Sequence, residues 1–312
     1  MNMNILEPSN QQKIYGLDSH FLELIRLYKA DLYPNKLLLS GQKGIGKSTL
    51  AYHFINYVLS DDEDYRYNIK NFEINSQSST FKTILNKSNT NLIVIDVNFD
   101  KKTIDINQIR ELIINLNKSS FNNKPRFVLI DNIDLLNVNS INALLKVLEE
   151  PNQNIHFILI NNNKKILNTL LSRCINYKIS LSNKQCLEIS DRLLGNQLIN
   201  LVNKDIISYY FTPGNIYNLL KFAEQYKYDL LKLNLKNFLK VLIKENHYKK
   251  DSFVKLMLFQ LMEFYFRKLN LPYSKKIMEK YSYFVRKISD TKTFNLDEES
   301  LFIEFEEDVL NG

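Results

Sequence analysis

Residues 41–48 form the stretch Gly-Gln-Lys-Gly-Ile-Gly-Lys-Ser, which matches the pattern G-x-x-x-x-G-K-[ST] of a phosphate-binding loop. The apolar run at 36–40 predicts a buried strand that enters the loop, and apolar residues from Leu50 to Val58 recur at helical spacing after it. This order of strand, glycine loop and helix favours folds in which strands and helices alternate. A glycine turn that binds nothing is the competing interpretation, and it gives no reason for the strand and helix on either side.

The residue types in this loop predict a binding site for a nucleotide and its Mg²⁺. Glycines let successive backbone N–H groups surround phosphate oxygens, and the start of the following helix adds partial positive charge. We expect the ammonium of Lys47 to contact the β- and γ-phosphates and the hydroxyl of Ser48 to bind Mg²⁺. The loop residues expected to bind the nucleotide are Gly41, Gly44, Gly46, Lys47, Ser48 and Thr49.

Two later apolar runs end in polar residues that belong to the same predicted site. Residues 127–130 lead into Asp131, and an aspartate at the end of a strand beside the loop helps to hold Mg²⁺. Residues 157–160 lead into a run of three asparagines, and we expect Asn161 to sense the γ-phosphate. The competing interpretations are a turn residue for Asp131 and an ordinary loop amide for Asn161, because loop asparagines are common in this chain.

The residue after Asp131 departs from the usual pattern of hydrolytic proteins with this loop. ATPases of this general type usually have a glutamate there, which orients the attacking water, whereas this chain has Asn132. An amide cannot accept a proton, and loss of a general base costs a factor of roughly 10²–10⁴ in rate. We therefore predict weak hydrolysis, and the sequence leaves open whether Asp134 replaces the missing carboxylate.

The first half of the chain alternates short apolar runs with segments of helical periodicity. This alternation predicts a mainly parallel sheet with helices on both faces, and the second half is predicted to be helical. Asn139 or Ser140 is the expected N-cap of one helix, and a turn at 212–215 is expected to precede a helix over 216–226. The predicted strands are residues 37–39, 92–95, 127–130, 157–160 and 175–179, and the predicted helices are residues 19–30, 48–59, 105–118 and 139–150.

The composition limits the partners and the compartment. A net charge of +7 favours an acidic partner such as nucleic acid. The competing interpretation is a general bias toward Asn, Ile, Lys and Tyr, which raises the lysine count without any such partner. No run approaches the roughly 18 apolar residues that span a bilayer, and the N-terminus lacks signal-peptide features, so we expect a cytoplasmic protein with no membrane partner. Two cysteines, Cys174 and Cys186, make neither a disulfide framework nor a zinc site, so no zinc is expected.

Several motifs occur together in an order that is typical of one family. They are the loop at 41–49, Ile-Arg-Glu-Leu at 109–112, Asp131, the block Asn-Ala-Leu-Leu-Lys-Val-Leu-Glu-Glu-Pro at 142–151 and Ser-Arg-Cys at 172–174. With these motifs the chain resembles the delta-prime subunits of bacterial DNA polymerase III clamp loaders, which are members of the AAA+ class. The resemblance covers roughly residues 12–180, and the last two motifs are far more specific than the phosphate-binding loop.

The resemblance implies an α/β P-loop AAA+ domain over residues 1–178, a small helical lid over 179–225 and an all-α collar domain over 226–312 that forms the oligomer. Subunits of this kind assemble with gamma/tau and delta subunits into a ring that loads the sliding clamp onto primed DNA, with ATP and Mg²⁺ as cofactors. Arg173 of Ser-Arg-Cys would reach the ATP of a neighbouring subunit in trans, a contact worth about 10³–10⁵ in rate. The expected contacts to the DNA backbone, for which solvated surface charge is the competing interpretation, are Lys101, Lys102 and Arg110.

Three functions compete on this sequence. The first is an interaction subunit that binds ATP, hydrolyses it poorly and supplies Arg173; Asn132 favours it, as does the absence of the arginine that motor subunits carry near 212–217. The second is a self-sufficient motor ATPase of the gamma/tau type, which the intact loop favours. The third, a small-molecule kinase, gives no reason for the block at 142–151. Many relatives also carry a four-cysteine zinc module after the loop, whereas residues 50–130 contain no cysteine.

Overall fold

The computed structural model divides the chain into two compact units, each of which is described by itself. Unit 1 comprises Met1–Ile189 with Thr212–Gly214, and unit 2 comprises Ser190–Phe211 with Asn215–Gly312. The predicted division at 178 and 225 into lid and collar stays a prediction. The structure describes residues 7–98, 101, 103–118, 122–149, 154–208, 211–269, 275–294 and 296–311.

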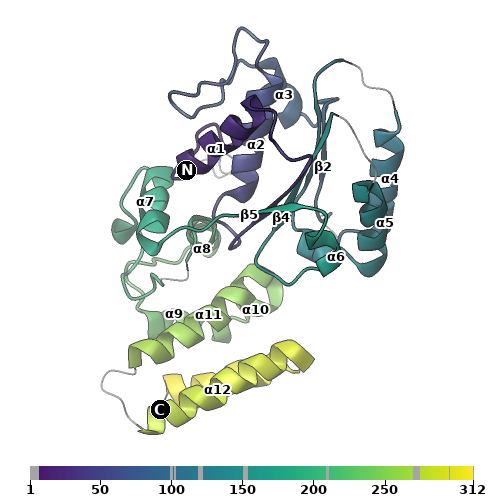
Figure 1. The fold of residues 1–312 in the computed structure, drawn as a ribbon. Coiled ribbons are helices and arrows are strands. Elements are labelled where there is room, and N and C mark those ends of the chain that lie inside the picture. Colours follow the sequence, from purple (N-terminus) through teal and green to yellow (C-terminus); the bar gives the residue numbers. More distant parts are fainter. Residues whose placement is uncertain are drawn as a thin grey trace. The chain divides into compact units, whose positions relative to one another are not determined.

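A parallel sheet forms the centre of unit 1 (Figure 1). The strand order is β2-β3-β4-β1-β5, and each neighbouring pair is parallel. Because strands β3 and β1 both lie against β4, the loops that leave their carboxyl ends come together at one edge of the sheet. The strands are β1 (Lys36–Ser40), β2 (Leu92–Ile95), β3 (Arg126–Ile130), β4 (Ile155–Asn161) and β5 (Ile175–Lys178). All of the predicted strands are therefore confirmed, with small changes at their ends.

Helices cover both faces of this sheet, as predicted from the alternating pattern (Figure 1). Successive strand residues point to opposite faces: Leu37 and Leu39 pack with α1 and α2, whereas Leu38 packs with α4 and α5. The central strands are buried on both faces, and their continuous apolar runs follow from that burial. The helices of unit 1 are α1 (Asp18–Lys29), α2 (Lys47–Leu59), α3 (Ser79–Leu85), α4 (Ile106–Leu116), α5 (Val138–Glu149) and α6 (Asn168–Leu171), and a 3₁₀ turn, η2, covers Ile133–Leu135.

Short polar side chains fix where several of these helices begin. Asp105 caps α4 and forms a capping box with Gln108, and Ser78 accepts a hydrogen bond from the backbone of Phe81 at the start of α3. The expectation that Asn139 or Ser140 caps α5 is wrong. Asn137 takes that place, because its Oδ1 accepts from the backbone N–H of Ser140 at 2.9 Å and α5 begins one residue after it.

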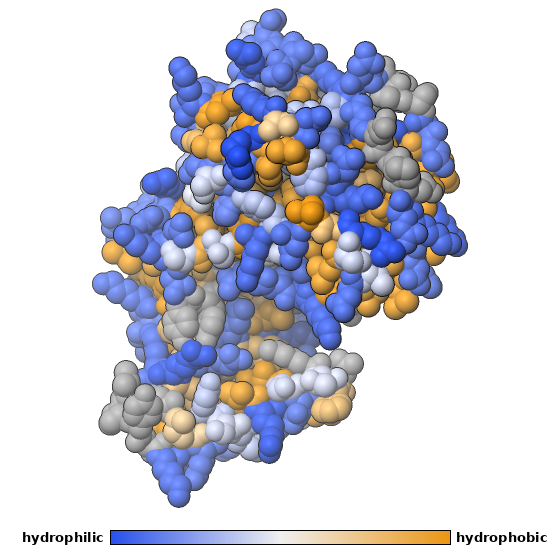
Figure 2. All heavy atoms as spheres, in the orientation of Figure 1, coloured by the Kyte–Doolittle hydropathy of each residue, from blue (hydrophilic) through white to orange (hydrophobic). Residues whose placement is uncertain are grey.

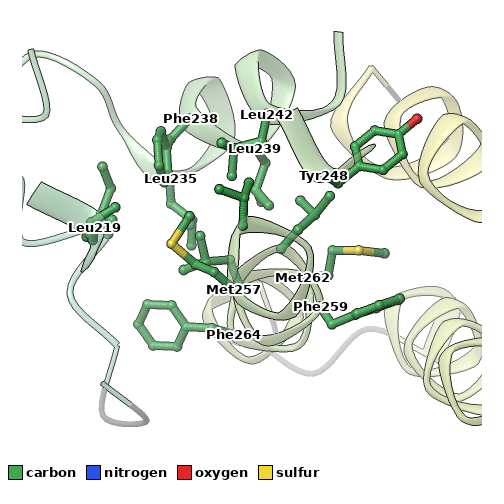
Figure 3. Close-up of a cluster of buried hydrophobic side chains, with 14 of the residues drawn as sticks. Leu219, Leu235, Phe238, Leu239, Leu242, Tyr248, Met257, Phe259, Met262 and Phe264 are labelled. Atoms are coloured by element: carbon green, nitrogen blue, oxygen red, sulfur yellow. The ribbon is translucent and has the colours of Figure 1, made fainter. Parts of the chain in front are cut away.

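Among the residues that the structure describes, unit 2 consists of helices joined by turns and has no strand, which agrees with the absence of strand patterns in the second half. The apolar side chains of α9 recur at positions i, i+4 and i+7, and Figure 3 shows Leu235, Leu239 and Leu242 gathered beside Met257 and Met262 of α11. Helix α7 (Asn183–Leu194) begins in unit 1 and ends in unit 2. The remaining helical segments are η3 (Leu198–Asn200), α8 (Pro213–Tyr226), α9 (Leu235–Lys244), α10 (His247–Lys250), α11 (Ser252–Leu269), α12 (Lys275–Phe294), α13 (Glu298–Phe305) and η4 (Glu306–Leu310).

The turn predicted at 212–215 is shorter than expected. Helix α8 begins at Pro213 and not at Ile216, so the proline occupies the first helical position, where its missing N–H costs nothing. On the surface, hydrophilic residues cover much of the face drawn in Figure 2, with smaller apolar areas between them. Among the described residues, no helix has the length and apolar character that a bilayer crossing requires.

Candidate functional site

The loop at 41–46 joins the carboxyl end of β1 to the first residue of α2, as the motif predicted. Gly44 and Gly46 have φ angles of 84° and 91°, a region that side-chain-bearing residues rarely adopt. Gly46 is also the N-cap of α2, so the helix starts with its free N–H groups directed toward the loop. Ser48 and Thr49 follow in the first turn of this helix. The sequence motif therefore has the backbone conformation that a phosphate cradle requires.

Lys47 lies buried within the loop that it is expected to serve, with 3% of its surface exposed. Its Nζ donates to the carbonyl of Gly41 at 3.0 Å, to that of Gln42 at 2.6 Å and to Oδ1 of Asn162 at 3.0 Å. Burial lowers the pKa of Lys47 to about 8, and the nearby carboxylate of Asp131 opposes that shift. A phosphate oxygen would therefore compete with three neutral acceptors for an ammonium whose charge is poorly solvated.

This pKa predicts how ATP affinity depends on pH. A bound phosphate favours the charged ammonium, so above pH 8 the empty site must take up a proton when it binds. We expect the dissociation constant for ATP to rise about tenfold between pH 8 and pH 9.5 in isothermal titration calorimetry, with proton uptake visible as a dependence on buffer ionisation enthalpy. The Lys47→Arg variant keeps its charge over this range and should lack the dependence. A wild-type affinity that is flat from pH 7.5 to pH 9.5 would contradict the assignment.

Ser48 and Asp131 meet at the edge of the sheet where β1 and β3 flank β4. Oγ of Ser48 donates to Oδ2 of Asp131, and Oδ1 of Asp131 accepts from the backbone N–H of Asn132 at 2.7 Å. Burial raises the pKa of Asp131 above its ordinary value, while these two donors work against the rise. A hydroxyl and a carboxylate side by side are oxygen ligands of the kind that Mg²⁺ takes beside nucleotide phosphates, so these residues fit the implied ion.

Asn132 occupies the position after Asp131 in a left-handed conformation, with φ 53° and ψ 46°. Its Nδ2 donates to Oδ1 of Asp96 at 2.7 Å, and its Oδ1 accepts from Nδ2 of Asn162 at 2.8 Å. The side chain that replaces the expected glutamate therefore bridges the ends of β2 and β4. An amide held in this way orders the edge of the site but accepts no proton.

The three asparagines after β4 have different partners. Nδ2 of Asn161, the residue that we expected at the γ-phosphate, donates to the carbonyl of Lys164 at 3.0 Å. The structure instead places the next residue, Asn162, against Lys47. The run of identical amides gives no signal for which one turns toward the loop, so Asn162 was missed, and the role of Asn161 at the γ-phosphate stays a prediction. Asp96 was also missed, because nothing near it in the sequence connects it to Asp131.

Asp134 lies close to the site but is already paired. Its Oδ2 forms an ion pair with Nζ of Lys164 at 2.9 Å, and its Oδ1 accepts a hydrogen bond from Nδ2 of Asn162 at 3.3 Å. Only 3% of its side chain is exposed. Both of its oxygens are therefore engaged, one with Lys164 and the other with Asn162. Whether Asp134 replaces the missing glutamate stays an open question of the sequence analysis.

The segment Thr212–Gly214 lies on the phosphate-binding loop within unit 1. Oγ1 of Thr212 donates to the carbonyl of Lys43, and the N–H of Gly214 donates to the carbonyl of Gly44, both at 2.9 Å. A Cβ on Gly214 would stand 2.7 Å from the Cα of Gly44, so only glycine permits this approach. The segment where motor subunits carry an arginine thus contacts the loop by a threonine hydroxyl and by backbone.

Arg173 lies between α6 and β5, outside this site. Its Nε and Nη2 donate to Oε1 of Glu149 at 3.1 and 2.5 Å, and its Nη1 donates to the carbonyl of Thr169 at 2.7 Å. Glu149 belongs to the block at 142–151, whose last two residues lie outside the described part of the chain. The two motifs that carry most of the resemblance are therefore in direct contact, a pairing that was not predicted from the sequence.

The predicted DNA contacts lie around the start of α4. Lys101 forms an ion pair with Asp105, the N-cap of α4, at 2.8 Å, and Arg110 is exposed on the same helix. Hydrogen bonding to Lys101 lowers the pKa of Asp105. Lys102 lies outside the described residues. A DNA phosphate would have to compete with Asp105 for Lys101, and the DNA role stays a prediction.

Two further features bear on ligands of other kinds. The described residues contain no group of three or more His, Cys, Asp or Glu side chains that could hold a metal ion, and Cys174 and Cys186 are both buried thiols. A hollow of about 620 Å³ lies at the amino ends of β1 and β4, where Asn35 and Asn154 precede these strands. It is at the opposite edge of the sheet from Lys47, so it is not part of the nucleotide site.

Comparison with curated proteins gives matches among DNA polymerase III subunits of two kinds. The subunit gamma of Buchnera aphidicola subsp. Schizaphis graminum is 29% identical over 193 residues, which cover 59% of this chain and 50% of the relative. The subunit delta' of Buchnera aphidicola subsp. Baizongia pistaciae is 31% identical over 167 residues, covering 47% and 46%. The chain thus spans about half the length of these relatives. The delta' of the Schizaphis graminum subspecies is 25% identical over 253 residues, covering 78% and 75%.

Solved structures and a family model complete the comparison. A DNA polymerase III gamma subunit-related protein from Thermotoga maritima gives a TM-score of 0.47 at 17% identity, covering 90% of this chain and 96% of that one. The RuvB branch migration motor of the same species gives 0.42 at 16% identity, covering 77% and 81%. The model of the family described as DNA polymerase III, delta subunit, matches residues 18–183, more than half of the 312 residues. The chain therefore belongs to the DNA polymerase III delta subunit family and is a subunit of the clamp-loader type.

Proposed function

We propose that this chain is a delta-prime-type subunit of a DNA polymerase III clamp loader, which helps to load the sliding clamp onto primed DNA. In this proposal it binds ATP and Mg²⁺ weakly or without efficient hydrolysis, and it supplies Arg173 to the nucleotide of a neighbouring subunit. Its partners are the gamma/tau and delta subunits, with the clamp and the DNA reached through the assembled ring. A role at DNA agrees with the cytoplasmic location expected from the sequence.

The observation that supports this proposal most is the combination of an intact loop with an amide in place of the catalytic base. The loop glycines, Lys47, Ser48 and Asp131 are groups of the kinds that hold Mg²⁺ and the phosphates of a nucleotide. Asn132 instead bridges Asp96 and Asn162, and it cannot take a proton from water. Binding without efficient turnover is the behaviour that this set of residues favours.

The contacts of Arg173 support its role in trans. The side chain is about one-third exposed, at 31%, and its Glu149 partner is 56% exposed. An ion pair that water reaches in this way is worth only about 0–1 kcal/mol, so a phosphate of another subunit competes with it readily. A guanidinium is suited to that task because its planar N–H groups match two phosphate oxygens at once.

A self-sufficient motor ATPase of the gamma/tau type remains the second candidate. The intact loop and the similarity to gamma subunits favour it, because a loop that binds no nucleotide has no need of a buried lysine. Two features argue against this candidate. One is Asn132 in place of the glutamate, and the other is the segment 212–217, which lacks the arginine expected of motor subunits.

Reconstitution of the loader tests the proposal. We expect the full-length chain to co-elute with the gamma and delta subunits of the same organism in size-exclusion chromatography and to be required for ATP-dependent loading of the clamp onto primed circular DNA. Loading that proceeds at full rate without the chain would contradict a subunit role. Loading that needs the chain would favour the motor alternative if it still proceeds when the phosphate-binding-loop lysine is intact in this chain alone and replaced in every other subunit.

A further inference from the structure

Acidic side chains fix the orientation of two amides in the nucleotide site. A carboxylate only accepts hydrogen bonds, so Asp96 requires the Nδ2 side of Asn132, at 2.7 Å, and the amide oxygen of Asn132 then faces Asn162. Nδ2 of Asn162 donates to that oxygen at 2.8 Å and to Oδ1 of Asp134 at 3.3 Å. Its own oxygen is left to accept from Lys47 at 3.0 Å.

If the amide of Asn162 were flipped, its donors would face a donor and its acceptor would face an acceptor. Its N–H groups would face the ammonium of Lys47, and its oxygen would face the carboxylate of Asp134, two arrangements that make no hydrogen bond. Both N–H groups of Asn162 are therefore committed to other side chains. The group that this residue turns toward the phosphate-binding lysine is an acceptor, which attracts an ammonium and repels a phosphate.

We propose that the site of this chain has no side-chain amide that donates to a γ-phosphate, and that it binds ADP and ATP with nearly equal affinity. The inference rests on the proposed nucleotide site and specifies which nucleotides that site holds. It also replaces our expectation that Asn161 senses the γ-phosphate, because the N–H of that amide goes to the carbonyl of Lys164.

The remaining groups around the loop point the same way. The loop N–H groups surround the β-phosphate, which ADP and ATP share. The inference places the ammonium of Lys47 on that phosphate too, in place of the expected γ-phosphate contact, because its three acceptors hold it inside the loop. The chain contains no arginine between Arg192 and Arg267, so the segment Thr212–Gly214 brings none to the loop. Asn132 has no carboxylate with which to hold a water beside a γ-phosphate. A nucleotide would then act as a constant structural element of the loop, and hydrolysis would not loosen its binding.

Equilibrium binding to the full-length chain tests the inference. Mg-ADP and the non-hydrolysable analogue Mg-AMP-PNP would be titrated separately by isothermal titration calorimetry at the same free Mg²⁺ and ionic strength. We expect the two dissociation constants to agree within about threefold, because a charge-assisted hydrogen bond made only by the triphosphate would separate them by about tenfold or more. The Asn162→Ala variant should leave the ratio unchanged. Asn162→Leu, which has a similar shape and no donor, provides a second variant if the first folds poorly by circular dichroism, and Asn161→Ala is the matched control.

Each outcome bears on the inference. Equal affinities for Mg-ADP and Mg-AMP-PNP support the inference, provided that replacement of Asn162 leaves their ratio unchanged. A triphosphate preference of tenfold or more overturns it, and loss of that preference in Asn162→Ala would show that the amide reverses when nucleotide binds. Failure of both nucleotides to bind a folded wild-type chain would overturn the proposed nucleotide site itself, and the inference with it.

Discussion

Replacement of Arg173 by alanine is expected to slow ATP hydrolysis by about 10³–10⁵ at the neighbouring site that this arginine serves in the assembled loader. A guanidinium stabilises the charge that spreads over the transferring phosphoryl group, and alanine has no group that does so. The effect should fall on kcat, because the contact strengthens in the transition state. Single-turnover hydrolysis by the assembly measures it.

The structure predicts that the Arg173→Ala chain stays folded. The side chain is partly exposed, and its partners are Glu149 and the carbonyl of Thr169, so removal loses a surface ion pair worth about 0–1 kcal/mol. Arg26→Ala is the matched control, because Arg26 forms an exposed pair with Glu23 at 2.7 Å. Equal turnover by the wild-type, Arg26→Ala and Arg173→Ala assemblies would contradict the role in trans.

Replacement of Lys47 by methionine is expected to weaken ATP binding by about 10²–10⁴. The lysine should make two charge-assisted hydrogen bonds to phosphate oxygens, each worth about 1.5–3 kcal/mol. Methionine has a similar length and no charge, so it fills the buried position while removing both bonds. Titration with Mg-ATP at pH 7.5, where the ammonium is mostly charged, measures the loss.

Lys43→Met is the control for this loss, since Lys43 belongs to the same loop but its side chain is exposed. It should change the affinity far less, because its charge is screened by water. The fold should survive both changes: burial has already lowered the pKa of Lys47, so the folded state does not gain stability from that charge. Similar losses in the two variants would show that net loop charge, and not Lys47 itself, holds the nucleotide.

The fold was largely predictable because its signals are local. Each strand is a short apolar run, and the carboxyl ends of neighbouring parallel strands necessarily meet at one edge, so Asp131 could be placed beside Ser48 from sequence alone. The start of α5 was harder to predict, because three nearby residues, Asn137, Asn139 and Ser140, all have side chains that cap helices.

The contacts that join distant residues were not predictable. Asp96 meets Asn132 across 36 residues, and Glu149 meets Arg173 across 24, and neither pair leaves a periodic signal in the sequence. Asn161 and Asn162 have identical side chains, so only the path of the chain after β4 decides which one reaches Lys47. The sequence therefore predicts the elements and the chemical groups of the site, whereas the tertiary structure decides their partners.

The most direct test of the central claim is a paired measurement of ATP binding and ATP turnover on the isolated full-length chain. The account predicts saturable binding of Mg-ATP that requires Lys47, together with turnover at least about 10²-fold below that of the gamma subunit measured in parallel, the loss expected without a general base. Brisk turnover by the isolated chain that disappears in Lys47→Met would contradict the account, and the chain would then be a motor ATPase in its own right.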